Sequence, residues 1–113
     1  MATELNLEAL RDEIDKIDEV IVRLLDSRAR CAYSVGRLKH ALGRPVYEPA
    51  REAAVIAHVR QVNEGLGGPL DGDAVARLYE RIMDEARRIQ RLEAERDAKQ
   101  QSDEAARASS GTE

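Results

Sequence analysis

Two basic residues of the N-terminal segment occupy positions where helical packing favours apolar side chains. Between residues 10 and 42 apolar residues recur every three or four positions, and Arg28 takes one of these positions. Lys39 follows eleven residues later, which at 100° per residue returns to within about 20° of the same helix face. A charge on a packing face is costly unless a partner compensates it. The two cations could therefore hold a small anion between them, or Arg28 could pack its stem and extend its guanidinium to water.

Arg11 is a third cation of this segment, and it points in another direction. It precedes Arg28 by seventeen residues, which on a helix means about 25 Å along the axis and a rotation of roughly 100°. Arg11 therefore cannot join Arg28 and Lys39 within one helix. A second copy of the helix, running antiparallel and crossing near residue 22, could bring Arg11 to them. The geometry allows a site shared by two chains and does not require it.

Polar residues also extend the apolar lines of two later segments. Glu52 lies three residues before the first valine of one line, beside Arg51, which could simply neutralise it. Gln90 ends the other line, where it could face the interior or be an ordinary exposed amide. The two lines consist of Val55, Val59 and Val62, and of Tyr79, Met83 and Ala86. Neither polar residue indicates a site by itself.

The apolar spacing predicts three helices that would carry these residues. The first extends over about Leu5–Leu42 without a proline and ends at Gly43. The second extends over about Pro49–Glu64, where a group of glycines stops it. The third follows a short turn, with Asp71 or Asp73 as its N-cap.

The first helix is too long for a compact domain of this size. At 1.5 Å per residue it would be about 55 Å long, whereas a chain of 113 residues should form a domain roughly 26 Å across. Its apolar face therefore needs a cover from outside the domain, and a second copy is the simplest. We expect an all-α homodimer, in keeping with 35% charged residues, three prolines and no Trp or Phe.

The folded domain is expected over residues 1–92, followed by a polar tail over residues 93–113. From Glu93 the apolar periodicity fades, and residues 100–113 include no hydrophobic residue larger than alanine. Such a composition cannot bury enough apolar surface to order a chain. The tail is therefore expected to be a frayed helix end followed by disorder.

Several other functions lack support in the sequence. The net charge of −4 disfavours nucleic acid as a partner, because phosphate binding needs a basic face. No apolar run is long enough to span a membrane, and the first ten residues lack a signal-peptide pattern, so we expect a cytoplasmic protein. His40 and His58 are isolated and Cys31 is single, so no metal site, cofactor site or nucleophile is predicted.

Taken together, these residues resemble the all-helical chorismate mutases, the AroQ class. The resemblance extends from about Leu7 to Arg91. It rests on the motifs Leu10-Arg11, Ile14, Ile17-Asp18, Leu24-Leu25, Arg28, Val35-Gly36, Lys39, Pro45-Val46, Arg51-Glu52 and Gln90. It implies an intertwined homodimer of three-helix subunits, in which the long first helices pair and each active site borrows an arginine from the other chain.

The resemblance also implies a role for each residue of the site. Arg28 and the partner subunit's Arg11 would hold the two carboxylates of chorismate. Lys39 and Gln90 would face its ether oxygen, and Glu52 would bind the ring hydroxyl.

Three further positions belong to the implied site. Arg51 would line it beside the second helix, and the backbone near Glu48 would assist. Ala86 stands where several relatives have a serine that contacts a substrate carboxylate. The lost hydrogen bond to a charged group would weaken binding by about 1.5 to 3 kcal/mol. Position 48 is Glu where some relatives have Asp, which would shift the loop slightly.

The reaction implied is the [3,3] rearrangement of chorismate to prephenate, an isomerisation in phenylalanine and tyrosine biosynthesis. It needs no cofactor, acid, base or nucleophile from the protein. Catalysis would rest on conformational restriction by the arginines and on electrostatic stabilisation of the ether oxygen as the C–O bond breaks.

Two rival functions stay open on the sequence alone. An isochorismate pyruvate-lyase shares the fold and the cations, but in that branch the position after the second helix's arginine is typically apolar, and here it is Glu52. A non-catalytic helical dimerisation module would explain the apolar face but gives no reason for Arg28 on it. Relatives are sometimes activated by a partner synthase, and the polar tail could serve such a contact.

Overall fold

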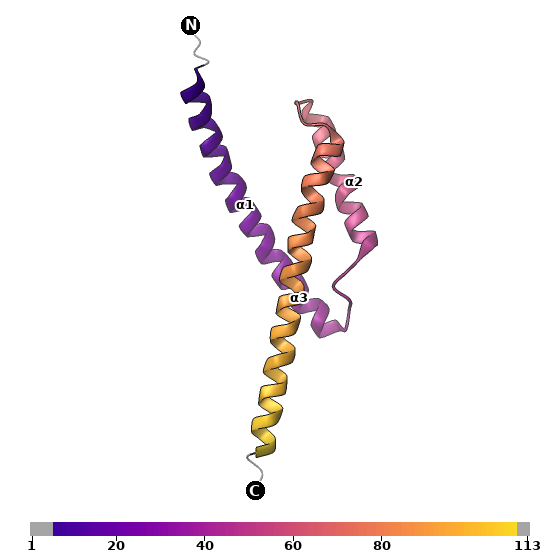
Figure 1. Ribbon diagram of the computed structural model, residues 1–113. Helices are drawn as coiled ribbons and strands as arrows, with labels where there is room; N and C mark the ends of the chain where they lie inside the picture. The colour runs from indigo at the N-terminus through magenta and orange to yellow at the C-terminus, as the bar shows by residue number, and fades with distance from the viewer. Residues whose placement is uncertain (1–5, 111–113) are drawn as a thin grey trace. The chain divides into compact units, whose positions relative to one another are not determined.

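The computed structural model describes residues 6–110, and three helices account for most of this range. They are α1 (Leu7–Leu42), α2 (Pro49–Leu66) and α3 (Gly72–Ser110), and the described residues include no strand (Figure 1). The predicted all-α fold and the very long first helix are thereby confirmed. Leu5, where the first helix was expected to begin, lies outside the described residues.

The helix ends follow the local chemistry of the sequence. At the start of α1 the side-chain oxygen of Asn6 accepts a hydrogen bond of 2.7 Å from the backbone N–H of Ala9, which satisfies one of the donors that a helix start leaves open. Asp71 caps α3 in the same way, at 2.7 Å from the N–H of Ala74. The other candidate cap, Asp73, instead pairs with Arg60 at 2.9 Å.

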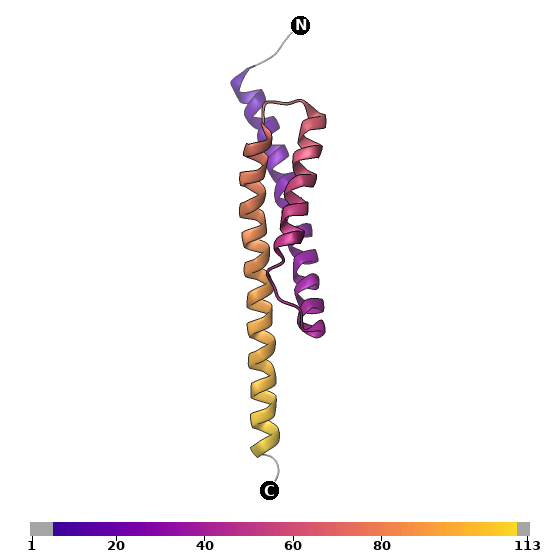
Figure 2. The same ribbon diagram turned by 90° about the vertical axis from the view of Figure 1, so that its right-hand side faces the viewer.

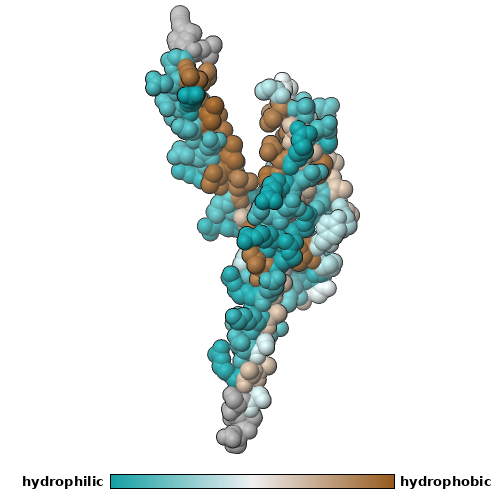
Figure 3. Space-filling model, viewed as in Figure 1, coloured by the Kyte–Doolittle hydropathy of each residue, from teal (hydrophilic) through white to brown (hydrophobic). Residues whose placement is uncertain are grey.

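The chain divides into two compact units, residues 1–31 and residues 32–113. In the first, the described part is a single helical segment of α1, which has an apolar stripe along one side (Figure 3). The large apolar side chains of this segment are 41–64% exposed: Leu7, Leu10, Ile14, Ile17, Val20, Ile21, Val22, Leu24 and Leu25. Because a lone helix cannot bury its own face, the stripe has no cover within this unit.

The second unit contains the end of α1, a connector over residues 43–48, and the hairpin of α2 and α3. The two helices of the hairpin run antiparallel and pack side by side (Figure 1 and Figure 2). Its buried side chains from α3 include Ala76, Met83 and Gln90, which follow one another at intervals of about two helical turns and therefore share one face.

The predicted apolar lines are buried only in part. Val55 and Val59 of α2 are half-buried as expected, whereas Val62 is exposed. On α3, Ile82 is half-buried and Leu78 is exposed. A 3-4 spacing identifies a face that is wider than the strip a single neighbouring helix covers, so the edges of that face stay in solvent.

The C-terminal part of α3 departs from the expectation of a frayed and disordered tail. The helix continues through Glu93 to Ser110, and the side chains of residues 98–109 are all exposed. This stretch is rich in alanine, glutamate, arginine and glutamine, which favour helix without any packing partner. The domain boundary at residue 93 stays a prediction, and residues 111–113 lie outside the described part.

No helix in the described range is both long and apolar enough to cross a membrane.

Gly36 controls how closely α3 approaches the end of α1. A Cβ atom built on Gly36 would lie 2.9 Å from Cγ of Gln90 and 3.3 Å from its Cα. Distances this short leave no room for a methyl group without a shift of the α3 backbone. The Val35-Gly36 pair of the sequence therefore marks a contact between two helices.

The first prediction concerns the turn between α2 and α3. Gly67 has a φ of 61°, a left-handed conformation that costs a residue with a Cβ about 1 kcal/mol or more, so Gly67→Ala should lower the free energy of unfolding by that amount. Gly65→Ala is the matched control, because Gly65 is helical with open space around it, and it should stabilise by roughly 0.5 kcal/mol. Urea unfolding at one protein concentration measures both. A shift of the same sign in both variants would contradict the explanation by φ.

The second prediction concerns the helix contact at Gly36. Gly36→Ala should lower the free energy of unfolding by about 1 to 3 kcal/mol, the usual cost of overpacking a close contact. Gly65→Ala again serves as the control, because no atom lies within 4 Å of its added methyl group. If Gly36→Ala stabilised the protein as a simple gain in helix propensity would, the close packing of α1 on α3 would be refuted.

Candidate active site

Lys39 is the centre of a polar cluster within the second unit. Its side chain is 11% exposed. Its Nζ donates to the carbonyl oxygen of Val46 at 2.7 Å and to Oε1 of Gln90 at 3.2 Å, and it forms an ion pair of 2.8 Å with Oε1 of Glu48. An ammonium group has three N–H donors. These three partners therefore match the full capacity of Lys39, and they join α1, the connector and α3.

Glu48, the charged partner of Lys39, has 40% of its side chain in solvent. The hydrogen bond from Lys39, reinforced by the charge of the ammonium, lowers the pKa of Glu48 below its ordinary value. The positive charges of Arg44 and Arg51 lower this pKa further. Glu48 is therefore a carboxylate at neutral pH, and it occupies a position that another anion or acceptor could take.

Gln90 is held by both ends of its amide group. Its Oε1 accepts from Lys39, and its Nε2 donates to the carbonyl oxygen of Ala32 at 3.2 Å. Reversing the amide would turn its NH₂ group toward the ammonium, so these contacts determine its orientation. The contact to Ala32 uses one of the two amide hydrogens. Gln90 is 8% exposed, which confirms the inward-facing alternative over an exposed amide.

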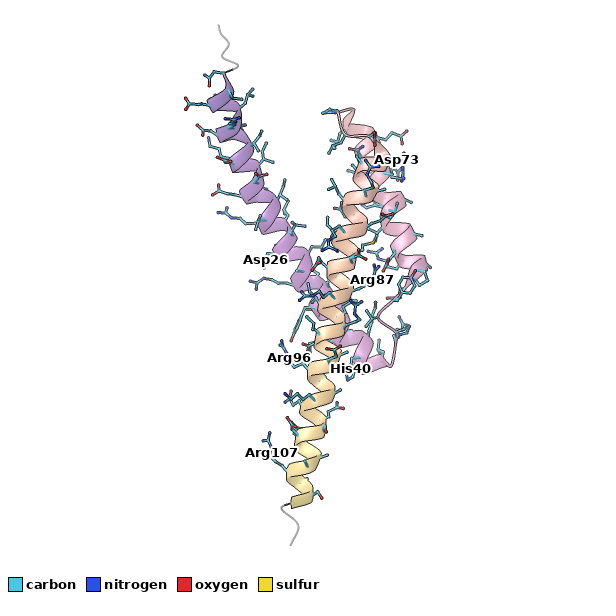
Figure 4. All side chains as sticks on the ribbon, viewed as in Figure 1. Asp26, His40, Asp73, Arg87, Arg96 and Arg107 are labelled. Carbon is cyan, nitrogen blue, oxygen red and sulfur yellow. The ribbon has the colours of Figure 1, made fainter. Side chains whose placement is uncertain are left out.

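Glu52 has a different partner from the one considered from the sequence. The partner is Arg87 of α3, which is labelled in Figure 4. Arg87 forms an ion pair with Glu52, and its guanidinium lies 5.7 Å from the centroid of the Tyr47 ring. The hydrogen bond to Glu52 raises the pKa of Arg87, partly opposed by burial. Arg51 is exposed and adjacent to Glu52, and adjacent side chains on a helix point about 100° apart. Arg87 therefore neutralises Glu52 in place of Arg51.

The remaining predicted site residues lie in two places. Ala86 is half-buried on α3, one residue before Arg87. Arg11 and Arg28 belong to the first unit, where Arg11 is exposed and Arg28 half-buried. Their position beside the Lys39 cluster stays a prediction. The structure thus brings together Lys39, Glu48 and Gln90, and separately pairs Glu52 with a residue outside the predicted set.

Two polar residues of this region were not identified from the sequence. Arg87 precedes Gln90 by three residues and Glu93 follows it by three, so helical spacing places both close to its face. Glu93 is only 4% exposed; its Oε1 lies 3.9 Å from Nε of Arg37, and its Oε2 has no hydrogen-bond partner among the described residues. The apolar line of Tyr79, Met83 and Ala86 has Gln90 as its next position. Arg87 and Glu93 are not positions of this line, so the line did not identify them.

The cluster is suited to binding and charge stabilisation. The described residues include no group of three or more His, Cys, Asp or Glu that could hold a metal ion. The polar groups that are gathered here are an ammonium and an amide, both of which donate hydrogen bonds, and carboxylates that accept them. Donors fixed in a largely buried position stabilise a negative charge that develops on a neighbouring atom.

Comparisons with known proteins identify the family of the chain. A profile of the family described as chorismate mutase type II matches residues 10–91. The bifunctional chorismate mutase/prephenate dehydratase of Pseudomonas aeruginosa is 48% identical over 88 residues, which are 74% of this chain and 23% of that protein. The T-protein of Enterobacter agglomerans is 39% identical over 80 residues, 71% of this chain and 21% of that protein. The chain thus spans less than a quarter of the length of these two relatives.

A solved structure is matched over nearly its whole length. The chorismate mutase of Thermus thermophilus, in its form II structure, has a TM-score of 0.71 and 32% identity, and the match covers 75% of this chain and 93% of that one. The profile, the relatives and the fold agree with the motifs recognised in the sequence. The chain therefore belongs to the type II, all-helical chorismate mutases.

Proposed function

We propose that this protein catalyses the rearrangement of chorismate to prephenate, an isomerisation that serves phenylalanine and tyrosine biosynthesis. The observation that carries the proposal is the contact in which Lys39 donates to the amide oxygen of Gln90, because it orients the ammonium and the amide within a buried cluster. Family membership adds the substrate, which this polar cluster alone does not identify.

The reaction itself explains why the site needs no acid, base or nucleophile. One C–O bond of chorismate breaks and one C–C bond forms within the same molecule, so no group is transferred to the protein. The flexible enolpyruvyl arm must be held over the ring, and fixing such a geometry can supply several kcal/mol of the barrier reduction. Arg28 and the partner subunit's Arg11 would do this by holding the two carboxylates.

Negative charge develops on the ether oxygen as the C–O bond lengthens. Lys39 and Gln90 would donate hydrogen bonds to that oxygen. Such donors stabilise the transition state most strongly when they are already oriented before the reaction. All three donors of Lys39 have partners in the structure, so the ether oxygen must replace one of them. Glu48 is the partner best placed to leave, because it lies on the connector and reaches solvent.

The rest of the site would recognise the ring. Glu52 would accept a hydrogen bond from the ring hydroxyl, and Arg51 would add positive charge nearby. Ala86 offers no hydroxyl to a substrate carboxylate, so substrate binding rests more on the arginines. The identity of the residue at position 52 supports the mutase over the pyruvate-lyase, since this position is typically apolar in the pyruvate-lyases and is Glu52 here.

We propose further that the active protein is a homodimer. The apolar stripe of the first unit is exposed along its whole described length, and water contact over such an area is unfavourable. A second copy would cover the stripe and supply Arg11 to the site. An activating synthase would be a separate partner, and the exposed polar residues of α3 beyond Asp97 are available for such a contact. We place the protein in the cytoplasm, where the free Cys31 would stay reduced.

The third prediction identifies the reaction. The purified chain should convert chorismate to prephenate, and Arg28→Ala should lower kcat/KM by about a hundredfold or more through loss of a charged hydrogen-bonding clamp. Isochorismate supplied to the same preparation should give no salicylate. Salicylate without prephenate would assign the pyruvate-lyase instead. A dimer that turns over neither substrate, and that Arg28→Ala leaves intact or stabilises, would assign a dimerisation module.

The fourth prediction tests whether two chains share one site. Arg11→Ala and Lys39→Ala chains should each be inactive alone, and after subunit exchange an equal mixture should regain about a quarter of the wild-type activity, because half of the dimers have one intact site. A mixture of Lys39→Ala with Gln90→Ala is the matched control and should regain nothing, since each of its sites keeps a defect. Equal recovery in both mixtures, or none in the first after confirmed exchange, would refute the shared site.

A further inference from the structure

Arg87 contacts three parts of the second unit, namely α2, α3 and the connector. The chemistry proposed above assigns it no role. Its guanidinium pairs with Glu52 of α2 and with Asp84 of its own helix, and it lies over the ring of Tyr47 in the connector. The Arg87 and Glu52 side chains are 24% and 23% exposed. Ion pairs at this depth are screened less than those on an open surface.

The contacts of Arg87 argue against direct binding of substrate. One terminal nitrogen faces Glu52 and the other faces Asp84, so two carboxylates already compensate a single positive charge. A guanidinium keeps further N–H donors, but its one positive charge is already matched by two carboxylates, so a third carboxylate, from a substrate, would meet little net attraction there. Any contribution of Arg87 must therefore act through a residue that it holds.

Glu52 is the residue on which Arg87 can act. Its side chain has three rotatable bonds, and freezing such a side chain costs conformational entropy. The contact with Arg87 engages one carboxylate oxygen, Oε1, and a carboxylate has two oxygens that accept hydrogen bonds. Restricting Glu52 through Oε1 leaves Oε2 to accept from a ligand without a further ordering cost at the time of binding.

We infer that Arg87 is a positioning residue that holds Glu52 as a fixed acceptor for the ring hydroxyl and so makes the site selective for a hydroxylated substrate. This inference rests on the proposed function, because it assigns Arg87 to the same site. It also gives a role to the charge of Arg87, which is adjacent to Ala86: the guanidinium orients Glu52, the acceptor for the ring hydroxyl, and does not itself bind a carboxylate of the substrate.

The kinetic consequence differs from that of a catalytic residue. The ring hydroxyl takes no part in the bonds that break and form, so its hydrogen bond to Glu52 has the same strength in the ground state and the transition state. Loss of such uniform binding raises KM and leaves kcat nearly unchanged. Residues that contact the ether oxygen should behave in the opposite way, because their contribution grows as charge develops.

The test combines a matched pair of variants with a double-mutant cycle. Arg87→Met removes the charge and keeps much of the stem, and Arg88→Met is the control, since Arg88 is 62% exposed and has only a long ion pair of 3.9 Å with Glu85. Arg87→Met should raise the KM for chorismate about tenfold or more, in line with a lost charged hydrogen bond, with kcat within about twofold. Arg88→Met should match the wild type.

The second part of the cycle shows whether Arg87 acts through Glu52. In a Glu52→Gln background, Arg87→Met should change KM by less than about twofold, because the carboxylate it holds is already gone. Arg87→Lys should raise KM less than Arg87→Met, since one ammonium can still hold Glu52. If Arg87→Met does not fold, Arg87→Lys measured in both backgrounds decides the same question.

Each other outcome overturns the inference. An equal rise in KM with and without Glu52 would make Arg87 a direct ligand of the substrate, and a fall in kcat at constant KM would make it part of the transition-state contacts. Identical kinetics of Arg87→Met and Arg88→Met would leave Arg87 with structural contacts alone. A wild-type chain that forms no prephenate would refute the proposed function first, before any variant is compared, and the inference with it.

Discussion

Burial of an ammonium group is unfavourable unless each of its N–H donors has a hydrogen-bond acceptor. Lys39 is buried, so the second unit must supply such acceptors. Its three partners come from the connector and from α3, so the condition is met only when the chain has turned back after α1 and α3 has come close. Gly36 permits the approach, since any side chain there would collide with Gln90. The fold and the site therefore depend on the same contact.

The hydrophobic core within one chain is small by comparison. The buried hydrophobic residues among those described are Ala32, Ala76 and Met83, which together offer little apolar area to oppose the entropy of an ordered chain. The exposed stripe of the first unit holds far more apolar surface. A second copy that covered it would supply the missing stability, so folding and association would be one process.

Electrostatic pairing also organises the candidate site. Lys39 with Glu48 and Arg87 with Glu52 each join a cation to a carboxylate on a different segment, and both pairs border the connector, at Glu48 and Tyr47. This arrangement keeps donors and acceptors oriented in advance and keeps the net charge of the cluster low. It suits a reaction that needs a fixed geometry and a stabilised oxygen and no exchange of protons with the protein.

Helical spacing alone predicted the three helices and the end of the first at Gly43, because each follows from residues a few positions apart. It left the cap of α3 open between Asp71 and Asp73, and it left Gln90 either inward or exposed; the structure decided for Asp71 and for a buried Gln90. The pairing of Glu52 could not be determined in this way. From Gln90, steps of three and of four reach Arg87 and Ala86, and both steps satisfy a helix equally. Only the packing of α2 on α3 decided that Arg87, and not the adjacent Arg51, meets Glu52, because that contact joins residues 35 positions apart, beyond the reach of any local pattern.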